Sequence, residues 1–268
     1  MAVITRITVQ KKNKSRFNIF LDRGHGEEFG FGVSEDVLVA FAISKGQEID
    51  EAELKDIVFE DEIKVAFNLA LNSLSYRMRS VKEIKDYLRK KETASEVIEK
   101  VLERLEHHQY VDDREFAKSF VRSRKRTSTK GPGAIYQELR QKGVAEGEIV
   151  SALEEYPQEE QMETAAKFAA KQARQHRKKS NTDMKRSIAQ SLAGKGFDRE
   201  VIDLALNEGE LEKGDDEEWE ALVLQAEKAH RRYNKYEGWE YEQRMKQYLY
   251  RKGFPFLMID QYLAGREP

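Results

Sequence analysis

Leu139-Arg-Gln-Lys142-Gly143-Val144 is the stretch that decides the fold, because the chain repeats its pattern twice more. The later copies have leucine, lysine and glycine at the same spacing, in Leu192-Ala-Gly-Lys195-Gly196-Phe197 and Leu249-Tyr-Arg-Lys252-Gly253-Phe254. Each copy continues with an isoleucine and a leucine at matching distances: Ile149 and Leu153, Ile202 and Leu206, Ile259 and Leu263. Such agreement is typical of a protein built from internal repeats.

The Lys-Gly pair predicts the end of a helix. A helix that ends in a Schellman motif places glycine where the backbone turns left-handed, and it packs the next residue against an earlier apolar one. Leu139 and Val144 are apolar, as this contact requires. The lysine places a positive charge at the negative end of the helix dipole. We therefore expect six residues to be structural caps of the repeats: Lys142, Gly143, Lys195, Gly196, Lys252 and Gly253.

A weaker copy of the pattern lies upstream, beginning at Leu88 and Lys91. It has Glu92 and Thr93 where the other copies have glycine and an apolar residue. Thr93 and Glu96 have the spacing of a capping box. We therefore expect this junction to differ from the others, with Thr93 opening the next helix.

A third helix precedes each pair. Apolar residues recur every three or four positions from Ile63 to Leu74, which indicates an amphipathic helix. In the next unit, Asp112 and Glu115 have the spacing of a helix cap. These patterns predict four three-helix repeats, at residues 61–106, 107–156, 157–211 and 212–268.

Residues 1–60 have a different character. Residues 4–10 and 16–22 are short β-branched or aromatic runs around a polar turn, which predicts a hairpin. We interpret Gly24, Gly26, Gly30 and Gly32 as a turn-rich hairpin connection, because no Gly-Lys-Ser/Thr of a phosphate loop follows them. Residues 37–43 fit either a helix or a strand. The sequence thus predicts an all-α protein of tandem three-helix repeats forming an elongated curved array, with a small β-containing N-terminal segment at 1–60.

Composition limits the setting of the protein. Charged residues make up 36% of the chain, against about a quarter in ordinary domains, and this suits a thin, surface-rich architecture. The chain has no cysteine, which fits a reducing cytosol. The first ten residues are too short and interrupted for a signal peptide, and no apolar run approaches the roughly 18 residues of a membrane span. We expect a cytoplasmic monomer without a membrane segment.

Nothing in the pattern indicates an enzyme. His107 and His108 have metal-ligand chemistry together with Asp112 and Asp113, but adjacent histidines cannot share one helical face. Asp112 is also used as a cap in the interpretation above. We expect no catalytic residues, no metal site and no cofactor.

Two basic clusters stand out on a chain with a net charge of -2. Residues 114–130 hold seven lysines and arginines against one acid, Glu115, and residues 171–186 hold a second run. Solvated helix ends are often rich in lysine and arginine as well. So one-sided a distribution nevertheless favours a basic surface that binds nucleic-acid phosphates or an acidic protein. An acidic stretch before the fourth repeat would repel DNA locally or mimic its charge: Glu208, Glu210, Glu212 and residues 215–218. The candidate contact residues are Arg122, Arg124, Lys125, Arg126, Lys130, Lys178 and Lys179.

The assembled residues resemble the RecX family of recombination regulators. The segment Tyr110-Val-Asp-Asp-Arg-Glu-Phe-Ala-Lys-Ser-Phe-Val-Arg-Ser-Arg124 is similar to the most recognisable part of that family. The following Lys130-Gly131-Pro132 and the upstream Tyr76-Arg77-Met78-Arg79-Ser80 also fit. The resemblance covers residues 62–206 well and the fourth repeat more weakly.

The resemblance implies a regulator that binds the RecA filament on DNA and restrains its ATP hydrolysis, strand exchange and recombination activity. Some relatives also bind DNA directly. The alternative that remains open is an autonomous nucleic-acid-binding helical repeat protein, which the two basic clusters favour. A general scaffold for unrelated protein partners ranks third.

Overall fold

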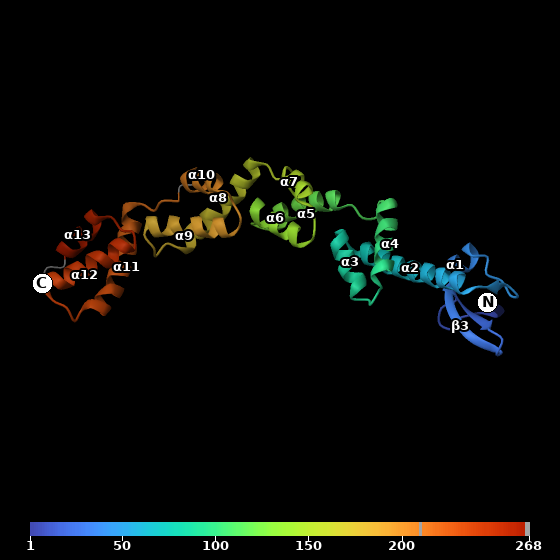
Figure 1. Ribbon diagram of the computed structural model, residues 1–268. Coiled ribbons are helices and arrows are strands. Elements are labelled where there is room, and N and C mark those ends of the chain that lie inside the picture. The colour runs from blue at the N-terminus through green and yellow to red at the C-terminus, as the bar shows by residue number, and fades with distance from the viewer. Residues whose placement is uncertain (209–210, 266–268) are drawn as a thin grey trace. The chain divides into compact units, whose positions relative to one another are not determined.

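The computed structural model describes residues 1–208 and 211–265 and divides into two compact units. The first unit comprises Met1–Phe116 and Lys142–Ala145, and the second comprises Ala117–Gln141 and the chain from Glu146 onward. Figure 1 shows the elements along the chain. The strands are β1 (Ala2–Val9), β2 (Arg16–Asp22), β3 (Glu27–Ser34) and β4 (Glu48–Ile49). Glu210 of the acidic stretch lies outside the described residues.

An antiparallel sheet of order β3-β2-β1-β4 forms the N-terminal segment. Residues that alternate along its strands, among them Ile4, Ile19 and Val33, are fully buried and form one side of a small core. The other side of that core includes Val37 of α1 (Glu35–Ala40) and Ile57 of α2 (Glu51–Tyr76). The expected hairpin is thus β1 and β2, and the ambiguous run 37–43 begins as a helix.

The hairpin connection is shorter than expected. Gly24 and Gly26 lie in the turn after β2, with φ of 94° and 102°. Gly30 and Gly32 lie in β3, so the interpretation of these two as a connection was wrong. A Cβ on Gly30 would lie 2.6 Å from Leu21 Cδ1, so glycine here lets β3 lie close against its neighbouring strand. The sequence did not indicate this strand, because two of its eight residues are glycines, which are depleted in strands and typical of turns.

Helix α2 connects the sheet to the first repeat. It begins at Glu51, where the side chain of Asp50 accepts a hydrogen bond from the Glu53 N–H, and it continues to Tyr76. Its early residue Ile57 belongs to the core of the sheet, whereas Ile63 and Ala66 belong to the core of the first repeat. One continuous helix therefore crosses residue 60, and the repeat boundaries stay a prediction.

Helices in groups of three follow the sheet, as the repeat pattern predicts. The helices after α2 are α3 (Val81–Arg89), α4 (Ser95–His107), α5 (Asp113–Thr127), α6 (Pro132–Gln141), α7 (Glu146–Leu153), α8 (Gln158–Gln175), α9 (Asn181–Gly194), α10 (Arg199–Glu208), α11 (Asp215–Tyr233), α12 (Gly238–Arg251) and α13 (Phe256–Ala264). The leading leucines of the pattern, Leu88, Leu139, Leu192 and Leu249, are fully buried. Amphipathic helices bury one stripe each in a separate small core, and this explains the high share of charged residues.

The second helix of each repeat ends in the same type of turn. Gly143, Gly196 and Gly253 have φ of 81°, 83° and 85°. The Phe197 N–H donates to the Leu192 carbonyl at 3.2 Å, and the Phe254 N–H donates to the Leu249 carbonyl at 3.3 Å. These are the bonds of a Schellman motif.

The first repeat uses this turn as well, which corrects the expectation for it. Glu92 has a φ of 61°, and the Thr93 N–H donates to the Leu88 carbonyl at 3.2 Å. Glu92 therefore occupies the glycine position in a left-handed conformation. Thr93 does not open the next helix, because Ala94 is the N-cap of α4 and makes no side-chain cap hydrogen bond.

The expected cap at the start of the second repeat is present. Asp112 Oδ1 accepts hydrogen bonds from the backbone N–H groups of Arg114 and Glu115, at 2.8 and 3.1 Å. The Pro157 and Gly214 residues that separate the later repeats are the N-caps of α8 and α11. Among the described helices, none is long and apolar enough to cross a bilayer.

Candidate interaction surface: repeat junctions and basic clusters

Each Lys-Gly turn is bonded to the repeat that precedes it in the chain. Ser80 Oγ, at the N-cap of α3, donates to the carbonyl of Lys142 at 2.7 Å. The backbone N–H of Gly131, just before α6, donates to the carbonyl of Lys195 at 2.8 Å. Ser180 Oγ, at the N-cap of α9, donates to the carbonyl of Lys252 at 2.5 Å. The same carbonyl of the repeat motif is therefore the acceptor in all three junctions.

Glycine is needed in these turns for a second reason, which is close approach between repeats. A Cβ on Gly196 would lie 2.2 Å from the backbone nitrogen of Ala134, and a Cβ on Gly253 would lie 2.8 Å from Ser180 Oγ. A Cβ on Gly143 would lie 2.7 Å from Lys82 Cβ. Each neighbour lies in the second helix of the preceding repeat or directly before it. The glycines thus combine a left-handed backbone with a contact that leaves no room for a side chain.

A carboxylate from the following repeat also binds the first N–H of these second helices. Asp113 Oδ1 accepts from the Val81 N–H at 2.9 Å, and both carboxylate oxygens of Glu218 accept from the Asn181 N–H, at 2.9 and 3.0 Å. The middle junction has Pro132 at this position. Proline has no N–H, so this helix start needs no such acceptor.

The motif lysines reach across the first two junctions as well. Lys142 Nζ lies 2.6 Å from Glu83 Oε1, and Lys195 Nζ donates to Thr129 Oγ1 at 2.8 Å. Burial raises the pKa of Glu83, but the hydrogen bonds and charges of Arg77 and Lys142 outweigh it and lower this pKa to about 2. Glu83 also completes a capping box with Ser80 at the start of α3. The lysine therefore does more than complement a helix dipole.

Sequence reasoning missed the donors of these junctions. Ser80, Gly131 and Ser180 each stand directly before the second helix of a repeat, where an N-cap is expected. Ser80 and Glu83 have the spacing of a capping box, which was a readable signal for a helix start. No local pattern shows that the same hydroxyl also bonds a carbonyl 62 residues further along the chain.

Most of the candidate contact residues near 114–130 are engaged in ion pairs. Arg122 lies 2.6 Å from Glu155, and Lys125 lies 2.9 Å from Glu160. Arg124 is bound to Glu138 at 2.7 Å, and Lys130 is bound to the same carboxylate.

These contacts also lower the pKa values of the carboxylates. For Glu138, burial raises the pKa, but the hydrogen bond from Lys130 and the charges of Arg124 and Lys130 outweigh burial. The pKa of Glu138 therefore lies below its usual value. The hydrogen bond from Arg122 lowers the pKa of Glu155. The cluster looks one-sided in sequence because its acids come from α6, the end of the second repeat and α8. Folding therefore neutralises much of the charge that the sequence places there.

Arg126 and Lys178 are the exceptions among the candidate contact residues. Both are exposed, and neither has an ion pair with a described residue. Lys179 Nζ donates to Ser187 Oγ at 2.6 Å and lies 3.7 Å from Asp183. Arg126 and Lys178 are therefore the candidates whose charge stays available to a partner.

The acidic stretch before the fourth repeat is partly used inside the fold. Glu218 is buried and lies 2.8 Å from Lys213 Nζ, with only 6% and 5% of the two side chains exposed. Lys213 Nζ also donates to the carbonyl of Lys179 at 2.5 Å. Glu212 pairs with Lys185 at 2.5 Å. Glu218 is therefore a structural residue of the third junction.

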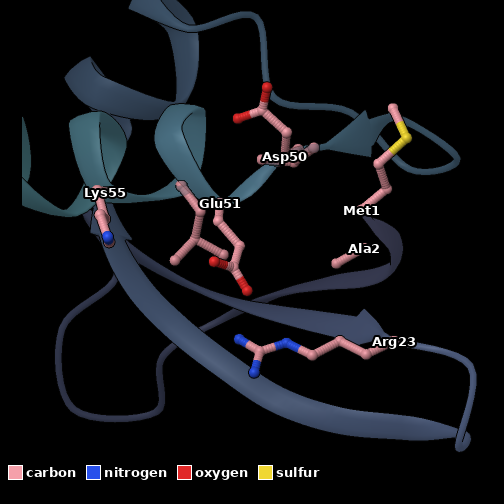
Figure 2. Close-up of a pocket in the computed structure, with 8 residues that line it drawn as sticks. Met1, Ala2, Arg23, Asp50, Glu51 and Lys55 are labelled. Atoms are coloured by element: carbon pink, nitrogen blue, oxygen red, sulfur yellow. The ribbon is translucent and has the colours of Figure 1, made fainter.

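The histidine pair and a pocket beside the sheet are the remaining candidates for a metal or small-molecule site. His107 and His108 contact each other, and among the described residues no group of three or more histidines and carboxylates is placed to hold a metal. A pocket of about 470 Å³ lies between the sheet and the start of α2. Figure 2 shows Arg23 on the sheet side and Glu51 and Lys55 on the helix side. Met1 at its edge is 86% exposed, so the pocket opens to solvent.

Family models for RecX match most of the chain. Residues 2–50 match the regulatory protein RecX N-terminal domain, residues 66–105 the first RecX three-helix domain, and residues 112–153 the second. The third three-helix domain matches twice, at 158–206 and 215–263. In agreement with this, α9 and α12 both have 14 residues, whereas α3 has 9 and α6 has 10. The fourth repeat is thus most similar to the third.

Relatives and solved structures agree with these matches. The regulatory protein RecX of Geobacillus sp. (strain WCH70) is 48% identical over 98% of this chain and 97% of its own length. That of Bacillus cytotoxicus is 43% identical over the same shares. A crystal structure of a regulatory protein RecX has a TM-score of 0.67 and 37% identity, covering 77% of this chain and 100% of that chain. RecX from Lactobacillus salivarius has a TM-score of 0.54 and 34% identity, covering 56% of this chain and 97% of that chain.

Proposed function

Because the chain belongs to the RecX family of regulatory proteins, we propose that it binds the RecA recombinase filament on DNA. In this proposal it restrains the filament's ATP hydrolysis, strand exchange and recombination activity. The single observation that carries the proposal is the repeated junction, in which the carbonyls of Lys142, Lys195 and Lys252 bind the preceding repeat.

A chain of similar repeats suits a partner that is itself repetitive. A filament presents identical subunits at regular spacing, and several weak contacts made at once add through effective concentration. Within the second compact unit, bonded junctions help because repeats held in a fixed relation lose less conformational freedom on binding than repeats on flexible linkers. The junctions thus supply what multivalent binding requires, while no single repeat needs a deep pocket.

The direct test adds the purified protein to RecA assembled on single-stranded DNA. We expect slower ATP hydrolysis and slower strand exchange, with the protein sedimenting together with the filament. Unchanged filament stability, ATPase and strand exchange would reject the proposal.

The contact residues are best tested at Arg126 and Lys178, which have no ion pair with a described residue. The double change Arg126→Glu and Lys178→Glu should weaken filament binding roughly tenfold, on the order of a kcal/mol for surface charge contacts. Lys11→Glu is the matched control, because Lys11 is an exposed cation in the N-terminal hairpin. Equal binding by both variants would remove Arg126 and Lys178 from the interface.

The alternative function, autonomous DNA binding through the basic clusters, loses part of its basis through the ion pairs of Arg122, Arg124 and Lys125. Reversing these paired residues would place carboxylates beside Glu155, Glu138 and Glu160 and would disturb the fold. If RecA modulation survives reversal of Arg126 and Lys178 while naked DNA binding is lost, the DNA contact is secondary.

A further inference from the structure

The turn between α11 and α12 combines an exposed aromatic ring with exposed cations. We define it as the α11–α12 turn, residues 231–239. Trp239 has 76% of its surface exposed. Arg231, Arg232 and Lys235 are also exposed, and none has an ion pair with a described residue. The same nine residues contain one acid, Glu237. This is the reverse of the cluster at 114–130, where most cations are paired.

The aromatic rings around this turn have defined positions. Arg244 lies over the ring of Tyr236 at 3.9 Å from the centroid, and Lys235 lies over the same ring at 5.1 Å. His230 Nδ1 and Tyr241 Oη are 2.9 Å apart. The rings next to Trp239 are thus held by neighbours, while the indole itself stays in water.

The other tryptophan of the chain shows what a structural role looks like. Trp219 is partly buried, belongs to the packed rim of the core of the fourth repeat and meets Tyr262 edge-on at 6.1 Å between ring centroids. Trp239 belongs to no such cluster of the described residues. An indole contributes stability through the apolar area that it buries, and Trp239 buries little of its own.

We propose that the α11–α12 turn binds single-stranded nucleic acid. A base stacks on the indole of Trp239, and Arg231, Arg232 and Lys235 neutralise the neighbouring phosphates. Exposed aromatic rings within a positive surface are the means by which proteins bind single strands with little sequence preference. The site goes beyond the proposed binding to RecA and does not depend on it.

The chemistry of the turn distinguishes this ligand from its competitors. A duplex keeps its bases stacked inside, so it offers phosphates to the cations but no free base to the indole. A run of acidic residues likewise offers carboxylates without a planar ring to stack. Only a single strand uses both features of the turn.

The test reads the indole directly, in the absence of RecA. In the full-length Trp219→Phe protein, Trp239 is the one remaining tryptophan, because the chain has two. Its fluorescence is titrated with oligo(dT), oligo(rU), a DNA duplex of equal length and polyglutamate. We expect quenching by one or both single strands, and comparison of these two shows whether the turn prefers DNA or RNA. Absence of quenching by both, or equal quenching by duplex or polyglutamate, would overturn the proposal.

Two variants sharpen the test. Trp239→Ala should weaken single-strand binding by about 5- to 150-fold, the range that corresponds to loss of one stacked base. The combined change of Arg231, Arg232 and Lys235 to Gln should lower the slope of log affinity against log salt by about 2, since each phosphate contact on a single strand contributes about 0.7. Because all four residues are exposed, the variants should fold as the parent does, which circular dichroism checks. Unchanged affinity and slope in both variants would contradict the site.

Discussion

Two junctions in the second compact unit hold the same motif in different ways. Between α6 and α9, the turn after α9 is bonded by backbone donors, because the N–H groups of Gly131 and Gly133 bind the carbonyls of Lys195 and Gly196 at 2.8 and 2.9 Å. Between α9 and α12, the corresponding turn is bonded by a side chain, Ser180. The acceptor stays the same while the donor changes. The turn therefore has the same Lys-Gly sequence in both junctions, whereas its donor can be a backbone N–H or a serine hydroxyl.

The two junctions also differ in charge. At the start of α9, the buried carboxylate of Glu218 accepts a hydrogen bond from the Asn181 N–H and pairs with Lys213. The start of α6 has Pro132 in that position and needs no acceptor. The stability of a junction formed by backbone contacts depends on room for close approach of the two backbones. The stability of one formed by side chains depends on each polar group having a hydrogen-bond or ion-pair partner. The four predictions that follow test how close approach and polar contacts stabilise the junctions.

The largest effect is expected for Lys213→Met. The change leaves Glu218 buried without its ion partner, and breaking a buried pair on one side costs about 3–5 kcal/mol. Urea titration of the free energy of unfolding measures it. Lys185→Met is the control, since its partner Glu212 is 69% exposed, and such surface pairs contribute about 0–1 kcal/mol. A loss below about 1 kcal/mol for Lys213→Met would show that the pair is not needed.

Gly196→Ala should lower the free energy of unfolding nearly as much as Lys213→Met does, and more than Gly253→Ala does. A left-handed alanine costs about 1–2 kcal/mol, and crowding adds about 1–3 kcal/mol. A Cβ at Gly196 would lie 2.2 Å from the backbone nitrogen of Ala134, whereas at Gly253 the nearest atoms are Ser180 Oγ and Thr182 Cβ, at 2.8 and 2.9 Å, so the clash is less severe there.

Gly194→Ala is the control for these glycine variants. A Cβ on Gly194, at the end of α9, meets no atom within 4 Å, so alanine should be neutral or stabilise by up to about 1 kcal/mol. Thermal unfolding of the three variants gives the order. Equal losses for Gly196→Ala and Gly253→Ala would show that backbone strain alone matters and that the junctions do not differ in space.

Ser180→Ala should cost about 1–2 kcal/mol, because it removes a helix cap and leaves the Lys252 carbonyl without its donor. Ser80→Ala should behave alike, since Ser80 bonds Lys142 in the same way. Ser95→Ala is the control: Ser95 is exposed in the first turn of α4, so a change within about 0.5 kcal/mol is expected. If all three serine variants lose the same small amount, the hydroxyls do not hold the junctions.

The smallest effect concerns acid pH at the first junction. Since folding lowers the pKa of Glu83 to about 2, its contribution is present above the unfolded pKa near 4.5 and is lost as the pH falls from there through about 2. Glu83 is partly exposed to solvent, so the contribution is on the order of 1 kcal/mol.

Asp113, in the same junction, acts in the opposite direction. Burial raises its pKa, although the Val81 N–H lowers it, so folding favours its protonated form and its contribution is lost as the pH rises. Glu83→Gln should flatten the acid-induced loss of stability between pH 5 and 2, and it should reduce the Asp113 effect slightly, because the charge of Glu83 contributes to the raised pKa of Asp113. A variant with the same acid profile as the parent would contradict the role of Glu83.

The repeats could be read from the sequence because their signals are local. A glycine that must turn left-handed, a buried leucine four residues earlier and an amphipathic stripe each depend on neighbours along the chain. The turn at Glu92 could not be predicted in this way, because a glutamate occupies the glycine position although its backbone is left-handed. Strand β3 was missed for a related reason, because its glycines read as a turn.

The candidate interaction surface could be predicted less well because charge pairing is not local. Arg122 and Lys125 look unopposed among their sequence neighbours, yet their partners Glu155 and Glu160 stand 33 and 35 residues further along. The exposed cations of the α11–α12 turn form a weaker sequence pattern, because that stretch is shorter and includes Glu237. Only the fold separates the paired cations from the available ones.

Hydrogen exchange of the Gly196→Ala protein tests the central claim most directly, namely that the Lys-Gly turns bind neighbouring repeats together. If they do, the amides of Gly131, Gly133 and α6 in the second repeat should exchange faster than in the parent, although the substitution lies in the third repeat. Faster exchange confined to α9 and α10, with α6 as protected as before, would show that the glycine only ends its own helix.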